Sequence, residues 1–387
     1  MHARFCLPRV RGRGAGLGNE LIPWARAAVA GHVLGARTLA PAFGLNPRRY
    51  RHYFDTPRLD WLGHRLLERV LPRFEFTEAD FLEHGGAPLS VAIRHFAERH
   101  RLGERSAWVM TTQGMWGGYR HVVEARDFVF SRLYLSNHAA ENLATIQSRL
   151  DPARITVGMH VRLGDFHAMS EMRTCQGQFN VSLPIDWYAN IARSIVERLG
   201  DEVQFLIVSD GTPLQLAPLL DSCRAITTLD IPNSDISDLL ALANTDLLVC
   251  SVSSYSAWAA FLSDAPYLWF EPNLQQIEGY YSIWGHEPGQ LNPAGYTRRA
   301  MDCCDDPEAR FLHARGVPVR RDGALPESLF DRIAARHRSA RPEFDLVCYG
   351  AVPVSASSEK TETRPFPPEC PGANSPGLQI LKTGSST

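Results

Sequence analysis

The sequence predicts an α/β protein whose second half contains a Rossmann-like parallel sheet. From Arg154 onward, short apolar runs alternate with segments of helical periodicity, which is typical of βαβ units. The apolar runs lack polar alternation, as expected of strands that helices cover on both faces. The chain has 387 residues, enough for two domains with a core each.

Residues 1–150 are expected to form a largely helical N-terminal domain. Apolar residues at helical spacing predict helices over 20–36, 89–100 and 138–150. Pro23 falls in the first turn of the first helix, where proline is tolerated. The segment 114–119 is rich in glycine and aromatic residues and is expected to be a loop.

Residues 151–345 are expected to form the second, Rossmann-like domain. A last helix is predicted over 327–339, after an irregular aromatic stretch at 271–300. Residues 346–387 are rich in Pro, Ser, Thr and Gly and are expected to be a disordered tail. The predicted strands are 155–161, 203–209, 225–229 and 246–252, and the helices between and after them are 184–199, 213–223, 235–244 and 254–263.

Composition narrows the class of protein. The formal net charge of −2 gives no overall positive field for nucleic acid. The eight cysteines are scattered and form no CxxC pair, which argues against a zinc site. Scattered cysteines in a chain of this length fit a reducing compartment. The basic N-terminus lacks the apolar core of a signal peptide, and no window approaches the ~18 apolar residues of a membrane span. We therefore expect a cytoplasmic protein, and peripheral association with the inner membrane stays open.

A glycine-rich turn precedes the first predicted helix. Gly14, Gly16 and Gly18 would let the backbone approach an anion at the helix N-terminus. Asn19 stands where a dinucleotide fingerprint needs a third glycine, which argues against a nicotinamide-dependent oxidoreductase. A tight turn that only starts the helix explains the glycines equally well.

The stretch "VGMHVRLGDF" places His160 and Arg162 two residues apart at the end of a predicted strand. Such residues face the same way, at the edge of the sheet where α/β proteins bind ligands. Arginine suits phosphate, and a neutral imidazole can contact a heterocycle. The alternatives are a satisfied core histidine and a surface ion pair between Arg162 and Asp165, and together the two residues favour a ligand.

Two later strand ends carry polar residues. Asp210 follows the strand 203–209 and is interpreted as a cap of the next helix. Asp238 begins the helix 235–244, where a carboxylate is favourable with or without a ligand. The fourth strand runs into Ser251, Ser253, Ser254, Tyr255 and Ser256, more hydroxyl groups than capping requires, and these are candidate phosphate donors.

Together these motifs resemble the GDP-fucose-dependent fucosyltransferase superfamily, and most closely the bacterial α-1,2-fucosyltransferases of glycosyltransferase family 11. Leu163 and Gly211 depart from an arginine and an aspartate in the family's patterns, and Ala257 departs from a tryptophan. The five matching stretches are 16–20 (GLGNE), 160–166 (HVRLGDF), 180–188 (NVSLPIDWY), 208–211 (VSDG) and 251–258 (SVSSYSAW).

The resemblance implies a GT-B-like fold, with two Rossmann-like domains facing across a cleft and the acceptor on the N-terminal side. It implies an inverting, metal-independent transferase that uses GDP-fucose as donor substrate and needs no other cofactor. A glycan hydroxyl would be the acceptor, with an α-1,2 linkage in surface polysaccharide biosynthesis. Arg162 would bind the β-phosphate, and His160 and Asp238 would recognise guanine. The pyrophosphate would be held by Gly16, Gly18, Asn19, Ser253, Ser254, Tyr255 and Ser256.

The residues leave several questions open. Asp165 is the first candidate for a general base and Glu20 is the second. The favoured role of Asp165, however, is to orient Arg162. A different nucleotide-sugar donor and a non-catalytic module that binds a nucleotide or glycan are the rival functions. The aromatic stretches 115–119 and 280–286 would serve either as an acceptor platform or as packing. The sequence names neither the acceptor nor the linkage, and it gives no oligomeric state and no role for the tail.

Overall fold

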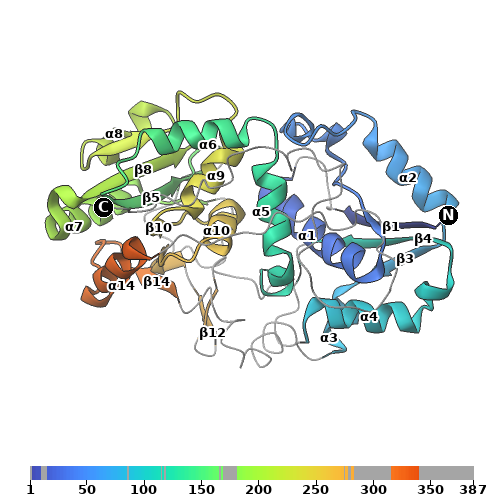
Figure 1. The fold of residues 1–387 in the computed structure, drawn as a ribbon. Coiled ribbons are helices and arrows are strands. Elements are labelled where there is room, and N and C mark those ends of the chain that lie inside the picture. The colour runs from blue at the N-terminus through green and yellow to red at the C-terminus, as the bar shows by residue number, and fades with distance from the viewer. Residues whose placement is uncertain are drawn as a thin grey trace, which may run out of the picture. The chain divides into compact units, whose positions relative to one another are not determined.

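The computed structural model describes residues 2–9, 15–84, 87–114, 116, 119–164, 167–168, 181–273, 275–277, 280–282 and 315–339. The chain forms two compact units that divide between Asn137 and His138 (Figure 1). Each unit has its own parallel sheet and its own core. No helix among the described residues is long and apolar enough to cross a bilayer. The predicted tail lies outside the described residues.

The first unit is built on a four-stranded parallel sheet in the order β2-β1-β4-β3. The sequence indicated the helices at 20–36 and 89–100 and missed the other helices and the strands of this unit. Trp24 of α1 packs edge-on against Phe43, Phe54 and Phe128 in the core. The strands are β1 (Ala3–Arg9), β2 (Arg37–Thr38), β3 (Arg73–Phe76) and β4 (Ala107–Gln113), and the helices are α1 (Leu17–Leu34), α2 (Asp60–Val70), α3 (Glu78–Leu82), α4 (Leu89–Arg99) and α5 (Arg126–Tyr134).

The second unit is built on a six-stranded parallel sheet in the order β14-β11-β10-β5-β8-β9. All four strands predicted here are present, so the predicted α/β class with Rossmann-like sheets is confirmed. The sheet strands are β5 (Ile155–Val161), β8 (Val203–Ser209), β9 (Ala225–Thr227), β10 (Leu247–Val249), β11 (Tyr267–Phe270) and β14 (Gly316–Val319), and the helices are α6 (Ala139–Ser148), α7 (Ile185–Leu199), α8 (Pro213–Leu220), α9 (Asp235–Ala243), α10 (Ser254–Leu262) and α14 (Glu327–Arg338).

Helices cover both faces of the second sheet. Val157 and Met159 of β5 share one apolar core with residues of α7, α8 and α14. On the opposite face, Gly158 lies directly beneath α9 and the residue Thr245 that follows it. This two-sided covering explains why the strands are apolar throughout.

Helix α6 belongs to the second unit, although the sequence-based division placed residues up to 150 in the first. It packs against α9, and the Asn142 side-chain amide donates to the carbonyl oxygens of Pro232 (2.9 Å) and Asn233 (3.1 Å). Two short strand pairs complete the described structure: β6 (His167–Ala168) pairs with β7 (Val181–Ser182), and β12 (Gln275–Ile277) pairs with β13 (Tyr280–Ser282).

Candidate functional site

The candidate site lies at the carboxyl ends of β5, β8 and β10. From β5 the chain adds β8 and then β9 on one side, and α9 returns it to β10 on the other side of β5. The strand order therefore reverses between β5 and β10. In doubly wound sheets this switch point opens a crevice where ligands bind.

His160, the penultimate residue of β5, is held by the serines that follow β10. Its Nδ1 lies 2.7 Å from Ser256 Oγ and 2.9 Å from Ser251 Oγ, and the backbone N–H of Ser251 donates to Ser256 Oγ (3.0 Å). The ring also faces Tyr255, with ring centroids 4.7 Å apart. The structure thus joins two of the stretches that the sequence singled out, and it gives His160 protein partners of its own.

The imidazole of His160 is neutral at physiological pH. Burial, and to a smaller extent the nearby charge of Arg162, lower its pKa to about 3, while the charge of Asp210 opposes the shift. His160 therefore contributes a fixed polar ring to the site and no second positive charge.

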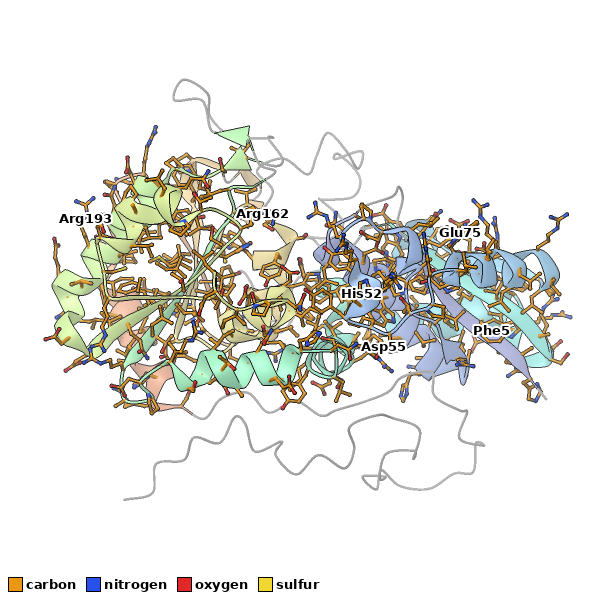
Figure 2. All side chains as sticks on the ribbon, turned by 90° about the horizontal axis from the view of Figure 1, so that it is seen from above. Phe5, His52, Asp55, Glu75, Arg162 and Arg193 are labelled. Carbon is orange, nitrogen blue, oxygen red and sulfur yellow. The ribbon has the colours of Figure 1, made fainter. Side chains whose placement is uncertain are left out.

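Arg162, labelled in Figure 2, follows the last residue of β5. It is oriented by Asp210, which follows β8. Its Nη1 lies 2.9 Å from Asp210 Oδ2, and the other carboxylate oxygen accepts from the Leu163 N–H at 2.8 Å. Two contacts to neighbouring residues fix the carboxylate, and the carboxylate in turn restricts the guanidinium. Asp165, the partner that the sequence favoured, lies outside the described residues.

The interpretation of Asp210 as a helix cap is wrong. Helix α8 is capped by Thr212, whose Oγ1 accepts from the Gln215 N–H (3.3 Å) while Gln215 Oε1 accepts from the Thr212 N–H (2.8 Å). This reciprocal capping box leaves Asp210 free to turn toward β5. Sequence reasoning missed the Asp210–Arg162 contact because it requires knowing that β8 is adjacent to β5.

Two glycines allow the loops after β5 and β8 to approach each other closely. A Cβ atom on Gly164 would lie 2.5 Å from Asp210 Oδ2, and a Cβ atom on Gly211 would lie 2.6 Å from Leu163 Cδ1. Leu163 and Gly211 are both departures from the family patterns, and the structure places them in contact. The two departures therefore form one local change.

The hydroxyl groups of the serine turn have three different kinds of hydrogen-bond partner. Ser253 caps α10 by accepting from the Tyr255 N–H at 3.2 Å. Ser251 and Ser256 hold His160, and the Tyr255 hydroxyl donates to the carbonyl oxygen of Asp235 in the first turn of α9. Ser254 is half-buried. Ala257 and Trp258 are buried, which places them in the core.

Asp238 is a buried carboxylate in the first turn of α9. Its side chain is 6% exposed, and its Oδ2 accepts from Ser234 Oγ at 2.8 Å. The other oxygen, Oδ1, is buried without a hydrogen-bond partner among the described residues. Burial raises the pKa of this carboxyl to about 7, and the nearby hydroxyl groups of Ser234 and Thr228 oppose the shift. An unpartnered buried acceptor is costly unless a ligand supplies a donor.

The glycine-rich turn lies in the first unit and leads into α1. Gly16 is the N-cap in extended conformation, the Leu17 N–H donates to the Tyr50 hydroxyl (2.9 Å), and the Asn19 N–H donates to the Gly16 carbonyl (2.9 Å). Gly18 lies in the same first turn, and Gly14 lies outside the described residues.

Glu20 is buried in this same turn. The Asn46 amide donates to its Oε1 at 3.2 Å, and burial raises the pKa of the carboxyl to about 7. A carboxyl at the start of α1 thus stands close to where the sequence expects a phosphate.

The described aromatic residues at 116 and 119 are buried. Trp116 packs on Phe76 and Phe81, and the Arg26 guanidinium stacks on its ring, 3.7 Å from the centroid. Tyr119 is also buried. These two rings pack inside the first unit, while Met115 and the side chains of 280–286 lie outside the described residues.

Over the described ranges, no group of three or more His, Cys, Asp or Glu side chains is gathered as a metal site would require. Cys6, Cys223 and Cys250 are free thiols. Independence from metal stays a prediction.

No family model and no curated protein matches the sequence. Among solved structures, POFUT1 in complex with GDP-fucose aligns with a TM-score of 0.41 and 12% identity, over 68% of this chain and 95% of that chain. POFUT1 in complex with GDP aligns with a TM-score of 0.40 and 13% identity, over 68% and 95%. Likeness this weak carries no argument about activity, so the function rests on the residues of this chain. Those residues form an α/β protein with a Rossmann-like parallel sheet in each unit.

Proposed function

We propose that the chain is an inverting, metal-independent glycosyltransferase that moves fucose from GDP-fucose to a hydroxyl group of a glycan. One observation carries this proposal. At the switch point of the second sheet, a guanidinium paired with a carboxylate occurs in the same unit as a buried carboxylate oxygen that has no hydrogen-bond partner in the described part of the chain. The first suits a diphosphate, the second suits a base with N–H donors, and the choice of fucose rests on the motif resemblance.

Arg162 would stabilise the departing diphosphate. The acceptor oxygen bonds to C1 of the sugar as the bond from C1 to the β-phosphate oxygen breaks, and the electron pair leaves with GDP. A guanidinium already oriented by Asp210 meets that charge without reorganising. The acceptor's proton passes to a base, for which Asp165 and Glu20 are the candidates.

Asp238 would select guanine. Guanine presents an N1–H and an exocyclic amine on one edge, and a carboxylate accepts from both. Adenine has an acceptor at N1, which would face Asp238 Oδ1 unfavourably. His160 and Tyr255 would contact the nucleotide from the end of β5 and the start of α10, and Ser253 and Ser254 would lie beside the pyrophosphate. Ser256 is fully buried and would act through its hydrogen bond to His160.

Calorimetry with GDP, ADP and UDP tests the nucleotide site. We expect the wild-type chain to bind GDP most tightly, and Asp238→Asn to weaken GDP about 10- to 100-fold because hydrogen bonds to a charged group are lost. Asp238→Asn should not weaken the ADP binding, because an amide can donate to adenine N1. The matched control is Asp235→Asn, one turn earlier and without a proposed nucleotide contact. Equal affinity of the wild type for GDP and ADP would overturn the guanine assignment.

A transfer assay separates the rival functions. Incubation with GDP-fucose and a glycan library should release GDP, and NMR of the product should show the opposite anomeric configuration to that of the donor. Turnover with GDP-mannose and none with GDP-fucose would assign a different donor. Tight GDP binding without turnover of any nucleotide sugar would assign a non-catalytic binding module.

A further inference from the structure

Helix α2 carries an apolar stripe that faces solvent. None of its residues is buried. Leu59, Leu62, Leu66 and Val70 are 59%, 44%, 61% and 67% exposed. Their spacing of three, four and four residues aligns them along one side of the helix. Single exposed apolar residues are ordinary, but an aligned group of four is typical of a contact surface.

The two acidic residues of α2 are turned away from this stripe. The Glu68 side chain is 8% exposed and forms an ion pair with Arg9. Both carboxylate oxygens of Asp60 lie within hydrogen-bond distance of the Gly44 N–H, at 3.1 and 3.2 Å. The outward side of the helix therefore presents neither of its acids.

Arginines flank the stripe. At 100° per residue, Arg65 and Arg69 project along one edge of it, while Arg58 precedes the helix and Arg73 follows it; all four are exposed. Segment 48–73 holds seven arginines and three acidic residues, a formal charge of +4, in a chain whose total is −2. Positive charge is thus concentrated beside the exposed leucines.

We propose that this surface, Leu59, Leu62, Leu66 and Val70 with Arg58, Arg65, Arg69 and Arg73, docks the protein on an anionic lipid bilayer. A short helix with an apolar side and a cationic edge lies in the plane of the interface, with its leucines in the acyl boundary and its arginines on phosphate headgroups. Figure 1 shows α2 at the margin of its unit. Its 11 residues are too few to span a bilayer.

Charge favours the bilayer over a second copy of the chain. In a two-fold dimer the same patch faces itself, so the arginine edges of two α2 helices would be brought together without acids to offset them. An anionic surface attracts the same arginines, by about fivefold in partitioning for each one near the membrane.

Vesicle flotation of the full chain tests the proposal. We expect it to float with vesicles containing about one third phosphatidylglycerol and not with phosphatidylcholine alone, and high salt should weaken binding. Arg65→Gln with Arg69→Gln should lower the partition coefficient about 25-fold. Leu62→Ser with Leu66→Ser should lower it by at least about tenfold.

Matched controls and a second readout keep the test decisive. Leu214→Ser removes a leucine of α8 that is 85% exposed, and Arg94→Gln removes an exposed arginine of α4; neither should change flotation. Anionic vesicles should also slow hydrogen exchange of wild-type residues 59–70, a readout that needs no substitution. Absence of wild-type flotation would overturn the proposal. So would a dimer, seen by ultracentrifugation without vesicles, that the leucine variant dissociates.

Discussion

The two helix starts that the sequence marked for phosphate differ in the charge around them. Helix α1 begins at Leu17 with the buried carboxyl of Glu20 in its first turn, and the Tyr50 hydroxyl accepts from its first N–H. Helix α10 begins at Ser254 beside a hydroxyl network on His160, and Arg162 lies close enough for its charge to lower the pKa of that ring.

A row of glycines or serines at a helix start does not by itself make an anion site. The dipole favours an anion at both helices, but side chains contributed by other elements decide the local charge. In the second unit, adjacent strands supply a cation and its orienting carboxylate. In the first unit, the helix supplies an acid. We therefore expect the second unit to carry most of the diphosphate affinity.

Among the variants that test this difference between the two units, Arg162→Ala should have the largest effect on the rate of transfer. Removing the guanidinium should lower the rate of transfer by about 10²–10³, because charge on the leaving diphosphate loses its main stabilisation. Arg154→Ala is the matched control, since Arg154 immediately precedes β5 at its other end and pairs with Asp151. Initial rates of GDP release measure both. A rate for Arg162→Ala close to that of Arg154→Ala would show that the guanidinium is not part of the reaction.

The protonation of Glu20 at the start of α1 can be tested through the free energy of unfolding. Its pKa in the folded chain is raised to about 7, so the folded state keeps a proton that the unfolded state loses near pH 4.5. The stability due to that proton is fully present below about pH 4.5 and is lost as pH rises through 7, by roughly 3 kcal/mol in all. Urea unfolding from pH 5 to pH 8 should show the decline.

Glu20→Gln should remove about half of that decline and leave the comparable part that Asp238 contributes by the same mechanism. Glu104→Gln, at an exposed position of the same unit, should leave it unchanged. An unaltered slope in Glu20→Gln would mean that the carboxyl is ionised at neutral pH. The start of α1 would then repel an anion more strongly.

Sequence patterns predicted the second sheet well and the first sheet poorly, for a physical reason. β5 and β8 are buried on both faces, so their apolar runs stand out. β1 contains Pro8, which argues against an interior strand because proline lacks an N–H. Pro8 is tolerated because β2 pairs only with Phe5 and Cys6, which leaves the proline paired with β4 alone.

The site was predictable as a set of residues but not as a set of contacts. His160, Arg162 and the serine turn stand out because polar residues follow apolar strands. The contact of Arg162 with Asp210 and that of His160 with Ser256 depend on strand order, which local periodicity does not contain. The unpartnered oxygen of Asp238 could not be foreseen, since it depends on the packing around α9.

Asp210→Asn sharpens the account of Arg162. The amide keeps its shape but loses the charge that fixes the guanidinium, so kcat should fall about 10-fold, and by at most about 10²-fold, with a smaller change in KM. Asp230→Asn is the control because Asp230 forms a comparable pair with Arg149 on the surface. Equal kcat for both variants would limit Asp210 to a structural role. Rescue by Asp210→Glu would support a positioning role.

The smallest effect concerns Leu163 and Gly211, where the chain departs from its resemblance in two touching positions. Leu163→Arg or Gly211→Asp alone should each lower the free energy of unfolding by about 1 kcal/mol, since an added Cβ at 211 crowds the leucine and the nearest acid to an added arginine, Asp210, is already paired with Arg162. The double variant should recover about 0.5–1 kcal/mol of that loss as an ion pair. Thermal unfolding of the four chains gives this coupling. Strict additivity would mean that the introduced arginine and aspartate do not interact, and a positive coupling would mean that these two positions can hold an ion pair beside that of Arg162 and Asp210.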